Sequence, residues 1–262
     1  MQDRNFDDLA ERFQRKVYGG LKGQIRLAVL WRDLEQAVLS GCSKPLRVLD
    51  VGAGFSQLSI RLAGLGHQVV VNDLSEKMLS AARLSAEQEA GVVDRISWHQ
   101  GPFQSLSVDE LGQFDLVMSH ALLEWLAEPK TLIPALKPFL LPEGQLSLTF
   151  YNYHSLVYRN LIRGNFNMLK RPEFVPDPDS LTPGNPLLPE QVRQWLADAG
   201  LEIVGSSGVR VFNDYVTTLR GGNAVPEAVI EMELDYSRQE PYLWLGRYVH
   251  HICRLAVDTR CA

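Results

Sequence analysis

The chain has 262 residues, 45% hydrophobic and 22% charged, which is typical of a soluble globular protein. Its formal net charge of −5 argues against nucleic-acid binding through a large basic field, although a local basic patch could still bind a structured RNA. No apolar run reaches the ~18 residues of a membrane span, and the N-terminus lacks the pattern of a signal peptide. The three cysteines lack metal-type spacing, so we expect reduced thiols in a cytoplasmic protein without a bound metal.

The first 150 residues predict a helical start followed by alternating strands and helices. Apolar side chains at near-helical spacing predict one or two helices within residues 6–39, with a break at Gly19-Gly20. The alternation that follows has expected strands at 46–50, 68–72, 95–99, 114–119 and 144–150, and expected helices at 57–65, 75–90 and 128–139. This pattern favours the Rossmann-like α/β class, a mostly parallel sheet with helices on both faces. Ligands bind such sheets beyond the carboxyl ends of the strands.

The pattern changes after residue 150. A short helix is expected around Leu156–Leu169, and prolines exclude regular structure from Pro172 to Pro189. We expect residues 151–187 to be an insertion that serves as a lid or docking surface, a plain connector being the alternative. Its basic side chains could form an RNA-binding patch or an ordinary solvated surface: Arg159, Arg163, Lys170 and Arg171. The remaining expected elements are a helix at 191–199, a strand within 201–211, a helix at 227–236 and a strand at 248–255.

A glycine turn follows the first expected strand, in the segment Val48–Ser56. Gly52 and Gly54 carry no Cβ and accept positive φ, so the backbone can approach a ligand closely, and the next helix begins with unpaired N–H donors. Asp50 would repel a pyrophosphate but suits a ligand with an ammonium and a sulfonium group. The segment resembles the Asp-x-Gly-x-Gly-x-Gly motif of class I S-adenosylmethionine-dependent methyltransferases, with Ser56 at the third glycine. An unliganded strand–turn–helix corner is the alternative.

Three more sites at the carboxyl ends of strands fit the same ligand. Asp73 ends the second expected strand, about 20 residues after the turn, where an acid binds ribose hydroxyls; its alternative is a helix N-cap. The loop Gly101, Pro102 and Phe103 would bracket an adenine, and His120 would face the methionine portion, although it could instead cap a helix or bond a carbonyl. The sequence lacks the Asn/Asp-Pro-Pro-aromatic motif of amino-group methylases after this strand and a cysteine nucleophile at a strand end.

Segments outside the glycine turn carry a more specific resemblance over nearly the whole chain. They are residues 1–8, 66–69, 146–152, 208–215 and 239–248, which are similar to the bacterial tRNA 5-carboxymethoxyuridine methyltransferases. This resemblance implies S-adenosylmethionine-dependent methylation of the 5-carboxymethoxyuridine carboxylate at the tRNA wobble position. It also implies that cofactor binding involves Arg26, Gly52, Ala53, Asp73, the 101–103 loop and His120. The expected organisation is a single methyltransferase domain over 1–262, with a helical cap (1–40), a cofactor-binding core (46–150), a substrate-side insertion (151–187) and a C-terminal completion of the sheet (188–262).

The implied chemistry limits what the substrate site must contain. A carboxylate with a pKa near ~4 is already ionised at neutral pH, so it needs placement and a cationic partner and no general base. Arg210 and Arg247 are candidates to hold it, and Tyr215 and Tyr248 could stack on the base, although each of the four could instead be structural. Two alternatives are a methyltransferase for a small carboxylate or quinone precursor, and a cofactor-binding protein without catalysis.

Overall fold

The computed structural model describes residue 7 and residues 20–171 and 183–257. One sheet of order β3-β2-β1-β4-β5-β7-β6 runs through the molecule. Its strands are β1 Arg47–Val51, β2 Gln68–Asp73, β3 Ile96–Gln100, β4 Phe114–His120, β5 Leu140–Tyr151, β6 Leu201–Val209 and β7 Tyr248–Leu255. The first five strands pair in parallel, and β7 is antiparallel to both β5 and β6. The mostly parallel sheet predicted from the sequence is confirmed.

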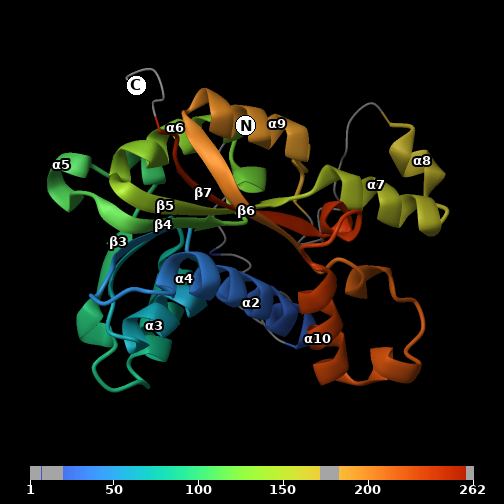
Figure 1. Ribbon diagram of the computed structural model, residues 1–262, viewed down its shortest axis with the longest axis horizontal. Helices are drawn as coiled ribbons and strands as arrows, with labels where there is room; N and C mark the ends of the chain where they lie inside the picture. The colour runs from blue at the N-terminus through green and yellow to red at the C-terminus, as the bar shows by residue number, and fades with distance from the viewer. Residues whose placement is uncertain (1–6, 8–19, 172–182, 258–262) are drawn as a thin grey trace.

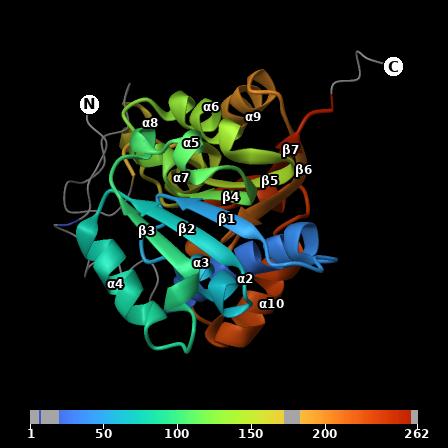
Figure 2. The same ribbon diagram turned by 90° about the vertical axis from the view of Figure 1, so that its left-hand side faces the viewer.

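Helices cover both faces of this sheet, as Figures 1 and 2 show. One layer contains α2 Leu21–Leu34, α3 Gln57–Gly64, α4 Glu76–Ala86 and α10 Pro226–Tyr236. The other contains α5 Val108–Leu111, α6 Leu132–Leu136 and α9 Pro189–Asp198, while α7 Tyr153–Ile162 and α8 Phe166–Leu169 extend beyond the sheet after β5. No helix among the described residues is long and apolar enough to cross a membrane.

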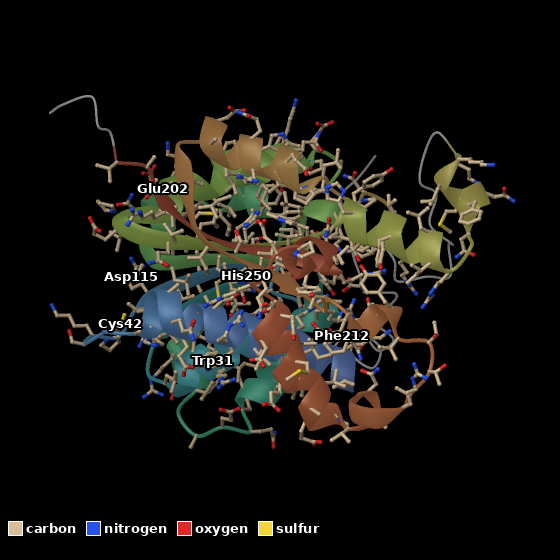
Figure 3. The ribbon with its side chains drawn as sticks, turned by 45° about the vertical axis from the view of Figure 1, so that its right-hand side comes forward. Trp31, Cys42, Asp115, Glu202, Phe212 and His250 are labelled. Carbon is tan, nitrogen blue, oxygen red and sulfur yellow. The ribbon has the colours of Figure 1, made fainter. Side chains whose placement is uncertain are left out.

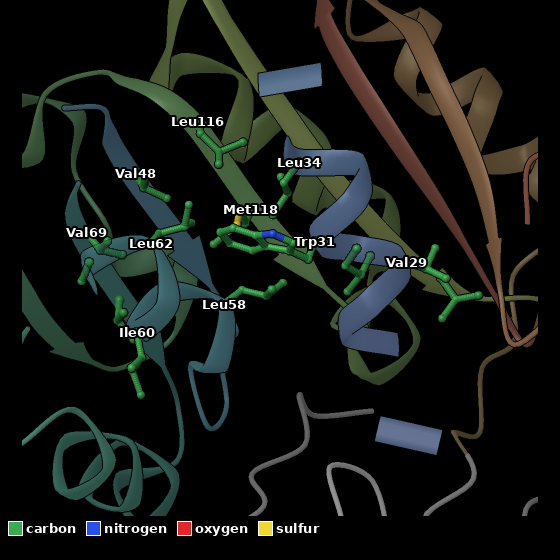
Figure 4. Close-up of a cluster of buried hydrophobic side chains, with 14 of the residues drawn as sticks. Val29, Trp31, Leu34, Val48, Leu58, Ile60, Leu62, Val69, Leu116 and Met118 are labelled. Carbon is green, nitrogen blue, oxygen red and sulfur yellow. The ribbon is translucent and has the colours of Figure 1, made fainter. Parts of the chain in front are cut away.

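Alternating side chains of the strands supply two hydrophobic cores, one on each face. Val48 of β1 joins the core under α2 and α3, whereas its neighbour Leu49 joins the core under α6 and α9. Figure 4 shows the first core, where Trp31 from α2 lies near Leu58 from α3 and Met118 from β4. This packing holds α2 against one face of the sheet. The polar side chains on the buried face of α2 therefore have fixed positions.

The structure differs from the expected elements in several places. Of the helix expected at 128–139, only α6 Leu132–Leu136 is α-helical, between 3₁₀ turns at Pro129–Thr131 and Lys137–Phe139. The helix expected around Leu156–Leu169 is two helices, because Gly164 adopts a φ of +71° and ends α7. The helix expected at 75–90 ends at Ala86, and β5 begins at Leu140 rather than at 144. A continuous helix is present from residue 21 into a π-helical end at Glu35–Leu39, whereas residues 8–19 of the expected N-terminal helices and most of the proline-rich loop lie outside the described residues.

Candidate functional site

The glycine turn after β1 has the left-handed backbone that its sequence indicates. Gly52 and Gly54 have φ values of +69° and +55°, and a Cβ on Gly52 would lie 2.9 Å from the Leu122 side chain. Ser56, at the third glycine position, also adopts a left-handed conformation (φ 52°, ψ 30°) immediately before α3. Serine is uncommon in this region, so the turn keeps the shape of a glycine-rich loop at a cost in backbone strain.

This turn borders a cavity that is partly open to solvent, and the empty space in it is about 730 Å³ when the open solvent at its mouth is included. The cavity is lined by predicted cofactor residues from five segments, namely Arg26, Gly52, Gly54, Asp73, Gly101, Pro102, Phe103 and His120. The other two, Asp50 and Ala53, line a smaller cavity that shares Arg26, Gly52 and His120 with the first. The structure therefore brings the predicted cofactor residues together at the switch point between β1 and β4.

Asp73 joins the glycine turn to the end of β2. Its Oδ2 accepts a hydrogen bond from the Gly54 N–H at 2.7 Å, and its Oδ1 accepts one from the Ser75 N–H at 2.8 Å. The α4 N-cap is Ser75, whose Oγ accepts from the Met78 N–H at 3.2 Å, so Asp73 is not the helix cap. Burial raises the pKa of Asp73 despite these amides. Each carboxylate oxygen keeps a further lone pair that can accept from a ligand in the cavity.

Asp50 is fixed more deeply, under the turn. Its Oδ2 accepts a 2.6 Å hydrogen bond from the Ser59 hydroxyl on α3, and the side chain is 4% exposed. Burial, with a smaller contribution from the Asp73 charge, raises the pKa of Asp50 to about 7. This carboxylate would stabilise a nearby cationic group, because burial makes charge–charge interactions stronger than in water.

The loop after β3 is held by a residue that sequence reasoning missed. Asn72 donates from Nδ2 to the carbonyl oxygens of Gly101 (2.9 Å) and His99 (3.1 Å), and the Gly101 N–H donates to the carbonyl of Asp73 at 3.0 Å. Phe103, which is buried, forms part of the cavity wall. Only the position of Asn72 directly before Asp73 in the sequence could have pointed to it.

His120 and Arg26 lie on the side of the cavity nearest α2. The His120 Nε2 shares a 2.8 Å hydrogen bond with the Ser147 hydroxyl of β5, and among the described residues the ring has no hydrogen bond to a helix end or to a carbonyl. Burial, with the neighbouring His250 and Arg26, lowers the pKa of His120 well below its ordinary value, so the ring is neutral. Arg26, on the buried face of α2, places its Cζ 4.3 Å from the ring centroid of Tyr248.

The candidate substrate residues lie beyond that ring, around a buried aspartate that the sequence did not single out. Asp214 Oδ2 pairs with Arg210 Nη2 at 3.1 Å and lies 3.7 Å from Arg247 Nε. The Arg210 Cζ lies 5.5 Å from the ring centroid of Tyr248, on which Arg26 also packs. Arg210 itself has a φ of +60°, which is uncommon for a residue with a side chain.

This group, called here the arginine cluster (Arg210, Asp214, Arg247 and Tyr248), has donors without hydrogen-bond partners among the described residues. They are Arg210 Nε, Arg247 Nε and Arg247 Nη1. Burial lowers the pKa of Arg210, while Asp214 opposes that shift. Tyr215 is placed differently, because its hydroxyl donates to the Leu245 carbonyl at 2.5 Å and contacts Ser155 Oγ at 2.8 Å. None of the four candidate substrate residues lies among the described residues that line the cofactor cavity; the four are Arg210, Tyr215, Arg247 and Tyr248.

Comparisons with known proteins identify methyltransferases as relatives of this chain. A methyltransferase domain family matches residues 49–148. The chain is 42% identical to the tRNA 5-carboxymethoxyuridine methyltransferase of Escherichia coli strain K12 over 97% of both chains. It is 28% identical to the ubiquinone biosynthesis O-methyltransferase of Acinetobacter baylyi, over 70% of this chain and 73% of that one.

Solved structures share the fold at lower identity. The magnesium protoporphyrin IX methyltransferase from Synechocystis PCC 6803 with bound SAH matches with a TM-score of 0.66 and 18% identity over 96% of both chains. The CcbJ methyltransferase from Streptomyces caelestis matches with a TM-score of 0.60 and 15% identity, also over 96% of both chains. The sheet order and these matches show the class I methyltransferase fold.

Proposed function

Because the chain belongs to the tRNA 5-carboxymethoxyuridine methyltransferase family, we propose that it methylates the carboxylate of 5-carboxymethoxyuridine at the wobble position of tRNA, forming the methyl ester. The matching domain family is described as a methyltransferase domain, and a solved methyltransferase with this fold has bound SAH. The ubiquinone biosynthesis relatives match with lower identity over less of the chain, so a quinone precursor is the weaker alternative. A tRNA substrate would also place the enzyme in the cytoplasm.

The residues around the main cavity fit the proposed cofactor. Gly52 lines the cavity, and only a residue without a Cβ fits there, because a Cβ would meet the Leu122 side chain. Asp73 has lone pairs for ribose hydroxyls, the 101–103 loop can bracket the adenine, and His120 with Arg26 can hold the methionine portion. Bound there, S-adenosylmethionine supplies an electrophilic methyl group on a sulfonium. The Asp50 carboxylate, when ionised, would stabilise that positive charge, and the neutral His120 would not repel it.

The arginine cluster is the observation that supports the substrate assignment. Two buried arginines, each less than a tenth exposed, face one aspartate. A buried cation without full compensation costs several kcal/mol, roughly, unless an anion binds to it. A substrate carboxylate would accept from the unpaired Arg247 Nη1 and balance this charge. Such pairing orients an already ionised nucleophile and removes no proton from it.

The same cluster is adjacent to the cofactor residues through one aromatic ring. Arg26 lines the cofactor cavity and packs on Tyr248, on which Arg210 also packs. The Arg247 guanidinium lies 4.6 Å from the ring centroid of Tyr151, at the end of β5. A carboxylate held by the cluster would therefore approach the methionine end of the cofactor rather than the adenine end, which lies near β3.

The α7–α8 segment offers a surface for the RNA itself. It exposes apolar side chains, Tyr158, Leu161, Ile162 and Phe166, and its basic side chains include Arg163 and Lys170. Aromatic rings stack on unpaired bases and basic groups contact phosphates, which suits an anticodon loop. The rings of Tyr158 and Tyr215 pack edge-to-face with their centroids 5.1 Å apart. Because Tyr215 directly follows Asp214 in the chain, this surface lies next to the arginine cluster. RNA binding is thus local and compatible with an acidic chain.

The variant Arg247→Gln tests the substrate assignment. It should lower methyl transfer to tRNA by about 100-fold or more, since a hydrogen bond between charged groups is lost where charge is buried. The affinity for S-adenosylmethionine should stay within about twofold by calorimetry. The matched control is Arg254→Gln, which removes an exposed arginine of β7 that pairs with Glu202 of β6. Equal methyl transfer by Arg247→Gln and wild type would remove Arg247 from the substrate site.

A further inference from the structure

A chain of buried hydrogen bonds leads from α2 to the cofactor cavity. The Asp33 Oδ2 on α2 lies 2.8 Å from His250 Nδ1 on β7, and His250 Nε2 lies 2.8 Å from the Ser147 hydroxyl on β5. That hydroxyl lies 2.8 Å from His120 Nε2 on β4, and His120 lines the cavity. Asp33, Ser147 and His250 are each at most 3% exposed. Figure 3 shows His250 near the centre of the molecule, close to the helical layer that contains α2.

Strand register explains why these side chains meet. His120 pairs across the sheet with Thr149, and Thr149 pairs with His250, so all three point to the face covered by α2. Ser147 precedes Thr149 by two residues and therefore shares that face. The two imidazole rings lie edge-to-face with centroids 5.7 Å apart, and the serine hydroxyl links them. The arrangement crosses three strands and a helix, and it joins residues more than 200 positions apart.

Hydrogen-bond chemistry gives this chain a direction. The hydrogen bond from His250 and the charge of Arg32 outweigh burial and lower the pKa of Asp33, so its carboxylate only accepts. His250 must then carry its proton on Nδ1. Arg32 (2.7 Å) and Arg238 (2.6 Å) already balance the charge of Asp33 at Oδ1. His250 therefore needs to supply only a hydrogen bond to this carboxylate and no further positive charge. Neutral His250 accepts at Nε2, and the single Ser147 proton points toward it.

We propose that Asp33, His250 and Ser147 are positioning residues that fix His120 in one tautomer, with its proton on Nε2 and a lone pair on Nδ1 for the cofactor. Because Ser147 donates to His250, it can only accept from His120. The Nδ1 of His120, which has no hydrogen bond with another described residue, then accepts from a cationic donor. The ammonium group of S-adenosylmethionine is such a donor. This inference rests on the proposed cofactor site and adds a residue set that controls it.

The variant Asp33→Asn should reverse the chain. Arg32 and Arg238 both donate to Oδ1, so the carboxamide oxygen stays there and the NH₂ group faces His250 Nδ1. His250 must then accept at Nδ1 and donate from Nε2. Ser147 turns to donate to His120 Nε2, and the His120 proton moves to Nδ1, where a donor would face the cofactor's ammonium group. His120 would then offer the cofactor a hydrogen-bond donor at Nδ1 instead of an acceptor.

The test uses the full chain labelled with ¹⁵N-histidine, without cofactor, and long-range ¹H–¹⁵N correlation of the His120 ring, assigned with His120→Gln. Wild type should show the Nε2–H tautomer, Asp33→Asn the Nδ1–H tautomer, and Ser147→Ala a mixture. The affinity for S-adenosylmethionine should fall about tenfold or more in Asp33→Asn and severalfold in Ser147→Ala. Ser147→Ala keeps the arginine contacts of Asp33, so it remains informative if Asp33→Asn unfolds.

The matched control is Thr149→Val, which removes a buried hydroxyl without a hydrogen-bond partner on the same face of β5. It should leave both the tautomer and the affinity unchanged. An Nδ1–H tautomer or a charged His120 in wild type would overturn the inference, as would a tautomer that Ser147→Ala leaves unaltered. Failure of wild type to bind S-adenosylmethionine would instead remove the cofactor proposal, and the ring spectra would still decide whether Asp33 sets the tautomer.

Discussion

Asp73 combines two roles that mutation can separate, because its carboxylate accepts from Gly54 and Ser75 while facing the cavity. Asp73→Ala should weaken S-adenosylmethionine binding by about 10- to 100-fold, the effect of losing hydrogen bonds to a charged group. Isothermal calorimetry measures this directly, with circular dichroism to confirm the fold. Ser75→Ala is the control: it should lower stability by ~1 kcal/mol through loss of the α4 cap and leave the affinity unchanged. Unchanged affinity in Asp73→Ala would refute the ribose assignment.

Glu124 provides a pH prediction at the same scale. Burial raises its pKa from 4.5 to about 7, although backbone amides and Arg26 oppose the shift. Between these values the folded state holds a proton that the unfolded state has released, so the free energy of unfolding falls as pH rises through this window. Glu124→Gln should be more stable than wild type at pH 8, by at most ~3 kcal/mol, and the difference should vanish near pH 4. Urea unfolding at several pH values checks this; a constant difference would contradict it.

Residues next to a recognisable local motif could be predicted from the sequence, and those defined by distant partners could not. Gly52, Asp73 and His120 each follow a strand in an interpretable position, and all three border the cavity. Asp33 and Asp214 look like ordinary surface acids in the sequence. Their burial depends on partners distant in the sequence, which are Arg238 and His250 for Asp33 and Arg247 for Asp214. Of the two tyrosines expected to contact the base, Tyr248 joins the arginine cluster while the Tyr215 hydroxyl is used within the protein.

At the scale of elements, hydrophobic periodicity predicted the parallel strands because each buried strand is a short apolar run between helices. The antiparallel direction of β7 has no local signal, since direction depends on the connection that crosses the sheet. The break at Gly164 was missed because one glycine inside a helical pattern is often tolerated. That break separates α8 from α7 and helps to form the exposed apolar segment proposed to bind RNA.

The α7–α8 surface makes an element-scale prediction. Phe166→Ala should weaken tRNA binding by ~1–3 kcal/mol through loss of base stacking, without changing S-adenosylmethionine affinity. Its side chain is 54% exposed, so the fold should not depend on it. Leu84→Ala on α4, which removes a side chain 62% exposed in the opposite helical layer, is the matched control and should bind tRNA normally. Equal loss in both variants, by filter binding at fixed salt, would argue against a specific role for this surface.

At the scale of the whole molecule, the fold places three systems on one side of the sheet. The cofactor cavity lies at the ends of β1 to β4, the arginine cluster lies beyond Tyr248, and the hydrogen-bond chain from Asp33 ends at His120 in the cavity wall. The net charge of −5 is compatible with this arrangement because the basic side chains of the cluster and of α7–α8 can contact the RNA locally. Association with tRNA should therefore rely on few phosphate contacts and show a shallow salt dependence.

The most direct test of the proposed activity uses bulk tRNA from cells that lack this protein. The tRNA is incubated with the purified chain and isotopically labelled S-adenosylmethionine, and its nucleosides are analysed by mass spectrometry. We predict a labelled methyl ester on 5-carboxymethoxyuridine that mild alkali removes, and about 100-fold less of it, or lower still, with Arg247→Gln. Absence of label in RNA, while the chain still binds S-adenosylmethionine, would contradict the tRNA substrate and favour a small carboxylate instead.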